Sequence, residues 1–133
     1  MMVRAATMED AFEFAGAKPF LRKALLAQVR RFPSLTVEHE GAALALATFH
    51  AVRRRRVEFA LWVKPEAGRH MTALVRLARL TLAGMAQDRR LVLARVALTD
   101  RQARRMAGLA GFINGRFEDR SIMLWKGDKR WVG

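Results

Sequence analysis

The feature that most constrains the fold is a nearly unbroken apolar run over residues 42–52. A strand with one face in water alternates apolar and polar residues, so this run suits a central strand that is covered on both faces. The run is far too short to cross a bilayer, and residues 1–7 lack the apolar stretch of a signal peptide. We therefore expect a cytoplasmic protein, without a membrane segment, that is built around one buried strand.

Local end signals divide the rest of the chain into short elements. Thr7 can cap a first helix, the Glu40-Gly41 pair indicates a tight turn, and Thr99 with Gln102 indicates a capping box. The predicted strands are 3–6, 34–39, 57–63 and 91–98, the predicted helices are 8–15, 19–32, 69–86 and 99–110, and a closing hairpin is predicted from 112–117 and 120–126.

The predicted elements follow the order β-α-α-β-β-β-α-β-α-β-β. The chain contains no repeat, low-complexity segment or linker, and its 133 residues match the usual length of one domain. We expect a single domain over residues 1–133, of the α+β class, with a mixed, mostly antiparallel sheet flanked by about four helices.

The formal net charge of +13 and the pI near 11.7 are the most unusual bulk properties. Such a charge favours anionic partners, namely nucleic acid, coenzyme phosphates or an acidic protein surface. The alternative is a compositional bias of the genome, because 20 of the 25 basic residues are arginine.

The chain has no cysteine, and histidines 39, 50 and 70 lack the spacing of metal ligands, so no metal site is expected.

Two groups of arginines form a candidate basic patch, one at a predicted hairpin and one along the last predicted helix. The candidates are Arg53, Arg54, Arg55, Arg56, Arg101, Arg104 and Arg105. They can grip phosphates or an acidic partner, or the first group can be a solvated strand end that discourages edge pairing. No aromatic residues are interleaved and no DNA-binding motif is present, so a protein partner is expected first and nucleic acid is the alternative.

The element order and three local sequences resemble the GNAT superfamily of N-acetyltransferases over nearly the whole chain. Residues 3–11 look like the family's first strand and capped first helix, and residues 62–66 look like the end of its fourth strand. Residues 103–112 look like its last helix, which ends in a Gly-Phe pair. The resemblance implies the GNAT fold and an acetyl-CoA site that begins at the loop after the fourth strand.

In the family, that loop carries an Arg or Gln followed by glycines, and backbone amides at the next helix N-terminus cradle the pyrophosphate. The resemblance implies that the cofactor-binding residues here are Trp62, Val63, Gly68, Arg69, His70, Met71, Thr72 and Ala73. The segment is shorter than usual and keeps one glycine. The alternative is that Gly68 only ends the strand and that Arg69 is a solvated residue.

The resemblance also implies two positions for acid and base. Many members place a tyrosine four residues before the glycine of the Gly-Phe pair, where it protonates the leaving thiolate; that position is Ala107, and the chain has no tyrosine. Glu58 matches a fourth-strand carboxylate that deprotonates the attacking amine in some members. The alternative for Glu58 is an ion pair with one of the adjacent arginines.

Three functions follow from these observations. The first is a non-catalytic GNAT-fold module that binds a macromolecular partner, because compact proteins with reduced coenzyme loops resemble the small virion-associated proteins of short-tailed phages. Such a protein is associated with a virion rather than with the cytoplasm of a cell. The second is an acetyl-CoA-dependent N-acetyltransferase that acts on an amine. The third, which depends on charge alone, is a basic nucleic-acid-associated module.

Overall fold

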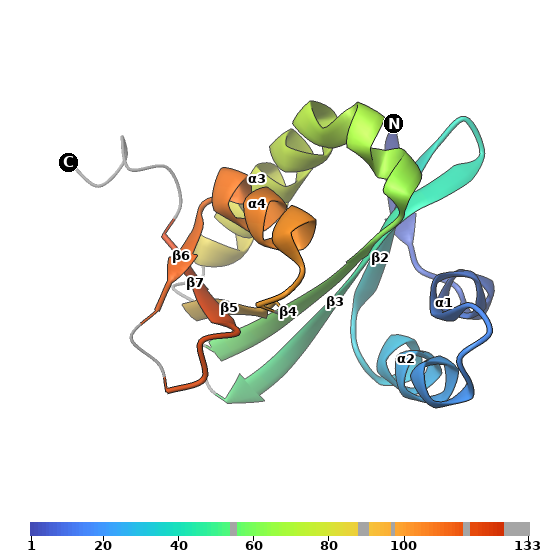
Figure 1. The fold of residues 1–133 in the computed structure, drawn as a ribbon, viewed down its shortest axis with the longest axis horizontal. Helices are drawn as coiled ribbons and strands as arrows, with labels where there is room; N and C mark the ends of the chain where they lie inside the picture. The colour runs from blue at the N-terminus through green and yellow to red at the C-terminus, as the bar shows by residue number, and fades with distance from the viewer. Residues whose placement is uncertain (54–55, 88–90, 97, 116–117, 127–133) are drawn as a thin grey trace. The chain divides into compact units, whose positions relative to one another are not determined.

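The structure is a computed structural model, which describes residues 1–53, 56–87, 91–96, 98–115 and 118–126, with the backbone alone at 52, 53 and 85–87. The elements are β1 Met2–Ala5, α1 Met8–Ala15, α2 Pro19–Arg31, β2 Ser34–His39, β3 Ala42–Arg53, β4 Arg56–Val63, the 3₁₀ helix η1 Pro65–His70, α3 Met71–Gln87, β5 Leu91–Arg95, α4 Arg101–Ala110, β6 Phe112–Asn114 and β7 Ile122–Trp125 (Figure 1). This order is the predicted one with η1 added.

The strands form one seven-stranded sheet in the order β1-β2-β3-β4-β5-β7-β6. Among the described pairings, β4 and β5 are parallel, and the pairs β1–β2, β2–β3, β5–β7 and β6–β7 are antiparallel. The parallel pair needs a crossover connection, which η1 and α3 supply. The predicted α+β class, with a mostly antiparallel sheet and four α-helices, is therefore confirmed.

The residues group into two compact units. Unit 1 comprises Met1–His50 and Leu61–His70, and unit 2 comprises Ala51–Ala60 and Met71–Gly133. The strands β3 and β4 contribute residues to both units. A single domain over residues 1–133 stays a prediction.

In unit 1, helices α1 and α2 lie side by side (Figure 1). Their contact is built on small and apolar residues, because Ala11, Ala15 and Leu25 are fully or nearly fully buried and share a cluster with Leu46 of β3.

The predicted buried strand is confirmed at β3, where both faces are covered over most of residues 43–49. The tight turn is confirmed as well, since Glu40 and Gly41 both have positive φ, of 51° and 81°, as a two-residue hairpin requires.

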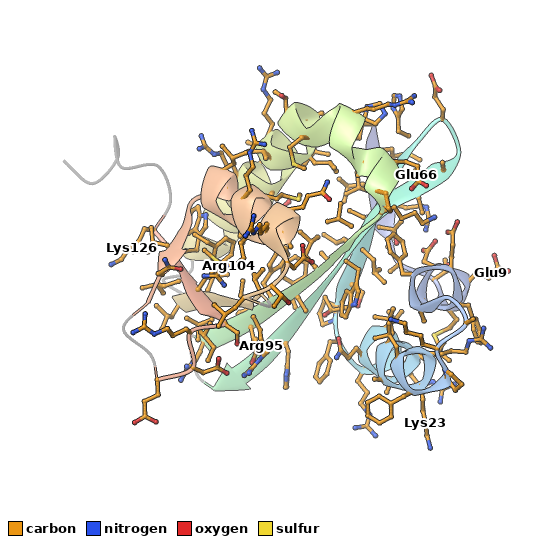
Figure 2. All side chains as sticks on the ribbon, in the orientation of Figure 1. Glu9, Lys23, Glu66, Arg95, Arg104 and Lys126 are labelled. Atoms are coloured by element: carbon orange, nitrogen blue, oxygen red, sulfur yellow. The ribbon has the colours of Figure 1, made fainter. Side chains whose placement is uncertain are left out.

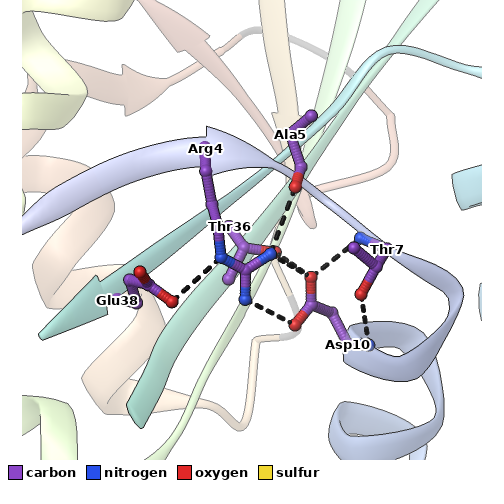
Figure 3. Close-up of polar contacts among 6 residues, drawn as sticks. All are labelled: Arg4, Ala5, Thr7, Asp10, Thr36 and Glu38. Carbon is purple, nitrogen blue, oxygen red and sulfur yellow. Dashed lines mark hydrogen bonds and ion pairs between the residues drawn. The ribbon is translucent and has the colours of Figure 1, made fainter. Parts of the chain in front are cut away.

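A buried carboxylate joins β1, α1 and β2 (Figure 3). Asp10, only 5% exposed, accepts from Arg4 Nη1 at 2.7 Å and Nη2 at 2.9 Å, from the Thr7 amide at 2.8 Å and from the Thr36 hydroxyl at 2.9 Å. Arg4 also donates to Glu38 at 2.9 Å. Burial by itself raises the pKa of Asp10, but the hydrogen bonds from Arg4, Thr7 and Thr36 outweigh it and hold that pKa well below its usual range.

In unit 2, helices α3 and α4 pack together, and the ring of Phe59 on β4 stacks on Phe112 at 6.0 Å between centroids. The predicted capping box is wrong by one residue: Asp100, not Thr99, is the N-cap of α4, and its carboxylate accepts from the Ala103 amide at 3.0 Å. An aspartate side chain reaches the amide three residues on as readily as a threonine does, so both residues fit the pattern. Gly111 caps the other end in the left-handed conformation, as the sequence suggests.

Three strands are shorter than the sequence predicts, and β7 is one of them, since it covers Ile122–Trp125 rather than 120–126. β5 ends at Arg95, one hydrogen bond from Val96 to the Ser121 carbonyl follows, and residues 98–99 form a turn. β6 ends at Asn114, and residues 116–117 lie outside the described part of the chain. Within that part, no helix combines the length and apolar character that a membrane span requires.

Candidate functional site

The connection between β4 and α3 is helical, although a loop is predicted there. Residues 65–70 form the 3₁₀ helix η1, so α3 begins at Met71 rather than at Arg69. Pro65 has a fixed φ that suits the first turn, and the amide of the buried Ala67 donates to the Lys64 carbonyl at 3.0 Å. The burial of the Ala67 side chain and this hydrogen bond thus hold the connection in a tight helix.

Gly68 lies inside η1 and does not need its conformational freedom. The described glycines with positive φ are Gly16, Gly41 and Gly111, and Gly68 is not among them. A 3₁₀ helix has backbone angles that any residue can adopt. The small size of Gly68 therefore matters for what approaches this exposed position, rather than for the path of the chain.

The end of β4 supports the core of unit 1. Trp62 packs against the cluster of Ala11, Ala15, Leu25 and Leu46, so its side chain contributes to the fold. The neighbouring Val63 is half-buried.

Lys64, which sequence reasoning did not single out, is also used by the fold. Its Nζ lies 2.6 Å from Glu13 of α1 and 5.1 Å from the centre of the Phe14 ring. The spacing of Glu13 and Phe14 on a predicted helix gives no sign that Lys64 contacts both. Trp62 and Lys64 therefore both contribute to the packing of unit 1, and a cofactor role of Trp62 stays a prediction.

The predicted cofactor segment is exposed at four of its six positions, namely Gly68, Arg69, Thr72 and Ala73. Within the part of the chain that the structure describes, the side chains of Arg69 and Thr72 make no hydrogen bond or ion pair. Two of the six residues have a different setting: Met71 is half-buried, and His70 contacts another ring. The exposed residues offer a guanidinium, a hydroxyl and backbone amides at the start of a long helix, which are groups that bind phosphate oxygens.

His70 contacts His39, at the end of β2, with 4.5 Å between ring centroids. His39 Nε2 lies 3.8 Å from Glu40. The two histidines are 31 positions apart in the sequence, and no periodicity links them. Across the described residues no group of three or more His, Cys, Asp or Glu side chains is arranged to hold a metal ion.

Glu58 lies in an ion-pair chain at the surface of unit 2. Its Oε1 accepts from Arg95 Nε at 3.2 Å, and Arg95 Nη1 donates to Asp119 at 2.8 Å. The pKa of Asp119 is lowered by the hydroxyl and the amide of Ser121 and by Arg95. The carboxylate of Glu58 is paired, as one alternative predicted, and the partner among the described side chains is Arg95 of β5. The side chains of Arg53, Arg54 and Arg55, which that alternative named with Arg56, lie outside the described part of the chain.

Arg95 was missed because its distance from Glu58 depends on the strand register. In the parallel ladder Glu58 is opposite Leu93, and Arg95 follows two residues later on the same face. The Glu58 side chain keeps 32% of its surface exposed and can therefore reach water or a ligand.

Ala107, at the predicted tyrosine position, is 8% exposed and lies on the buried side of α4 with Met106 and Ala110. A methyl group has no proton to donate. The position thus belongs to the apolar core of unit 2.

The structure divides the candidate basic patch. Arg54 and Arg55 lie outside the described residues, Arg53 is described by its backbone alone, and Arg56 is half-buried. Arg104 is engaged internally, because it donates to the Val96 carbonyl at 3.0 Å and to Asn114 at 2.7 Å. Figure 2 labels Arg95 and Arg104, two arginines of unit 2 whose side chains contact other segments of this unit. The two exposed arginines of α4 are Arg101 and Arg105.

Comparisons with known proteins identify the fold. No family model matches the chain, and no curated protein matches its sequence. Solved structures that share its fold include an N-acetyltransferase of Staphylococcus aureus (21% identity, 92% of this chain and 93% of that one, TM-score 0.62). They also include the ribosomal-protein-S18-alanine N-acetyltransferase of Escherichia coli (16%, 93% and 92%, 0.66) and the PaiA N-acetyltransferase of Thermoplasma acidophilum in complex with coenzyme A (13%, 92% and 96%, 0.67).

Proposed function

We propose that this chain, which has the fold of the GNAT N-acetyltransferases, binds acetyl-CoA and transfers its acetyl group to an amine. The observation that carries the proposal is the exposed segment 68–73, where Arg69 and Thr72 have no partner among the described residues. It comprises the second half of η1 and the first residues of α3, the longest helix. The resemblance of the sequence to the family implies this segment as the site of the coenzyme pyrophosphate.

The residues of this segment fit a diphosphate. Arg69 can pair with phosphate oxygens, the Thr72 hydroxyl can donate to them, and the amides of the first turn of α3 point toward the helix N-terminus. Gly68 lets a ligand approach the backbone closely. The bound coenzyme supplies an activated acetyl thioester, and the protein's task is to hold it and to manage protons.

Glu58 is the proposed base. A carboxylate that is one-third exposed can take a proton from an ammonium acceptor directly or through one water molecule. Arg95 fixes the orientation of this carboxylate through the 3.2 Å contact. The thiolate of the coenzyme, which leaves as the acetyl group is transferred, needs a proton. Ala107 cannot supply that proton, so in this proposal water or the acceptor donates it.

Calorimetric titration with acetyl-CoA, with plain CoA for comparison and at two salt concentrations, tests the binding step. We expect saturable binding that persists at the higher salt concentration. Arg69→Glu should weaken it about tenfold, because a charge-assisted phosphate contact is lost. Arg120→Glu changes the net charge equally at an exposed residue outside the segment, and it should leave the affinity within about twofold. No binding, or equal losses in both variants, would contradict the proposal.

Amine acetylation tests the chemical step. Wild-type protein should acetylate an acceptor from a panel of polyamines and peptide N-termini, and Glu58→Gln should lower kcat at least about 100-fold with little change in acetyl-CoA affinity. Binding without turnover in the wild type, or full activity of Glu58→Gln, would remove Glu58 from its proposed role.

A second candidate is supported by two specific observations. Ala107 is a buried alanine where many family members have their acid, and Glu58 is held by Arg95. A protein that keeps the GNAT fold for its surface, like the virion-associated proteins of short-tailed phages that the sequence resembles, has no need of either group. This candidate predicts that acetyl-CoA does not bind. The nucleic-acid alternative loses Arg104 from its patch, because that guanidinium is engaged internally.

A further inference from the structure

Helix α2 of unit 1 has an outer face that no described residue covers. The residues of this face recur every three or four positions and are all exposed: Phe20, Lys23, Ala24, Ala27, Arg30 and Arg31. The other side of the helix carries the buried Leu25 and the half-buried Leu21 and Val29, which pack within unit 1. Figure 2 shows Lys23 on the side of α2 that points away from α1. We call these six residues the α2 outer face.

Phe20 has no role in the folded core. Its side chain is 89% exposed, more than any other large apolar residue of the described chain, whereas Leu25 of the same helix is fully buried. Single exposed apolar residues are common, but an aromatic ring at this exposure beside several cations is the composition of an interface anchor.

The cations of this face are also unpaired. Within the described residues, Lys23, Arg30 and Arg31 make no ion pair or hydrogen bond, and α2 contains no acidic residue. Arg30 and Arg31 lie in the last turn, where cations stabilise the helix dipole. Lys23 lies in the first half of the helix, where a cation gains nothing from the dipole. Helix stability therefore does not account for the whole charge pattern.

Ala24 and Ala27 form the middle of the face. Two small side chains between longer cations leave a shallow strip on which the backbone or a helix of a partner can lie closely. The carboxylates of such a partner would meet the cations along both sides. The Phe20 ring would meet an apolar residue at one end.

We propose that the α2 outer face docks an acidic polypeptide segment that presents carboxylates around an apolar strip. A second copy of this chain is disfavoured, since it would bring the same cations together. A nucleic acid is disfavoured because the centre of the face is apolar and only one ring is available for stacking. A membrane is disfavoured because one ring and two alanines bury too little apolar surface for stable insertion. This surface does not involve segment 68–73, and the proposal does not depend on acetyl-CoA binding.

The test uses the full-length protein and a labelled synthetic helical peptide of about 14 residues, which matches the length of α2. The peptide presents glutamates on both sides of a leucine strip. We expect saturable binding by fluorescence anisotropy, and amide chemical-shift changes that concentrate on α2. The double variant Lys23→Glu/Arg30→Glu should weaken binding at least about tenfold, and Phe20→Ala should weaken it about fivefold with Phe20→Trp restoring it.

The matched control is Arg76→Glu/Arg120→Glu, which changes the net charge equally at two exposed residues outside α2. It should change the peptide affinity by less than about twofold. Equal losses in the two double variants would overturn the proposal, because they would show attraction by net charge alone. Absence of peptide binding would overturn it as well. So would tighter binding, through the same face, of an equally charged single-stranded oligonucleotide or of vesicles of phosphatidylserine and phosphatidylcholine.

Discussion

The chain enters a helix from a strand in two contrasting ways, at the β1–α1 junction and at the β4–α3 junction. At the first, Thr7 and Asp10 close a capping box and Asp10 also holds Arg4, so the free amides and the charges are satisfied by the protein itself. At the second, the chain passes through η1, and no described side chain caps α3. The first junction is built for stability, and the second leaves polar groups available to a ligand.

The largest expected effect is that of Asp10→Ala, which tests whether the first junction is built for stability. The substitution leaves the Arg4 guanidinium, the Thr7 amide and the Thr36 hydroxyl without their common acceptor. The half-buried guanidinium then keeps Glu38 alone, and the buried Thr36 hydroxyl loses its acceptor, so the unfolding free energy should fall by about 3 kcal/mol. Urea denaturation should show this loss, whereas Asp100→Ala, which removes the more exposed N-cap of α4, should cost about 1 kcal/mol. Equal costs would show that the Asp10 network adds nothing beyond its cap.

The second prediction concerns pH. The pKa of Asp10 is lowered in the folded protein, so the unfolded chain binds the proton more readily there. The stabilisation is complete above the unfolded-state carboxyl pKa of about 3.9, and it is lost as the pH falls from there toward the folded-state value.

Thermal or urea unfolding from about pH 5 down to pH 2 checks this prediction. The wild type should lose about 2 kcal/mol more over this range than Asp10→Asn, whose amide does not titrate. Glu118→Gln, at an exposed carboxylate outside the network, should behave as the wild type does. Parallel curves for the wild type and Asp10→Asn would contradict the assignment.

The first junction could be predicted from sequence, because its signals are local. Thr7 and the acidic turn lie within four residues of each other. The Glu40-Gly41 turn and the Gly111 cap of α4 are likewise each marked by one or two adjacent residues. The nearly unbroken apolar run of residues 42–52 predicted the buried strand β3 for the same reason. Arg4 and Thr36 could not be assigned to Asp10, since their contacts depend on how β1 and β2 pair.

The second junction was predicted less well, for a physical reason. A glycine after a strand signals a break, but it does not distinguish a loop from a 3₁₀ helix that a buried alanine holds in place. The partner of Glu58 depends on the β4–β5 register, which a crossover of more than twenty residues hides from the sequence. The capping residue of α4 was displaced by one position, because Thr99 and Asp100 are both good N-caps.

The third prediction tests the open junction with Arg69→Ala/Thr72→Ala. Both side chains are exposed and without partners among the described residues, so the unfolding free energy should change by less than about 0.5 kcal/mol. The acetyl-CoA affinity should fall at least about tenfold, because charge-assisted contacts to phosphate are lost. A stability loss near that of Asp10→Ala would show that this junction is also built for the fold.

The smallest expected effect belongs to Gly68→Ala, which separates the two uses of a glycine. Gly68 lacks the positive φ of Gly111, so alanine fits its backbone and the unfolding free energy should stay within about 0.5 kcal/mol or rise slightly. Gly111→Ala, at φ 112°, should cost about 1 kcal/mol in the same denaturation experiment. If a ligand's phosphate approaches the backbone at Gly68, the added methyl group lowers acetyl-CoA affinity without lowering stability. If the affinity of Gly68→Ala equals that of the wild type, the phosphate contacts come from side chains, and the open junction acts through Arg69 and Thr72.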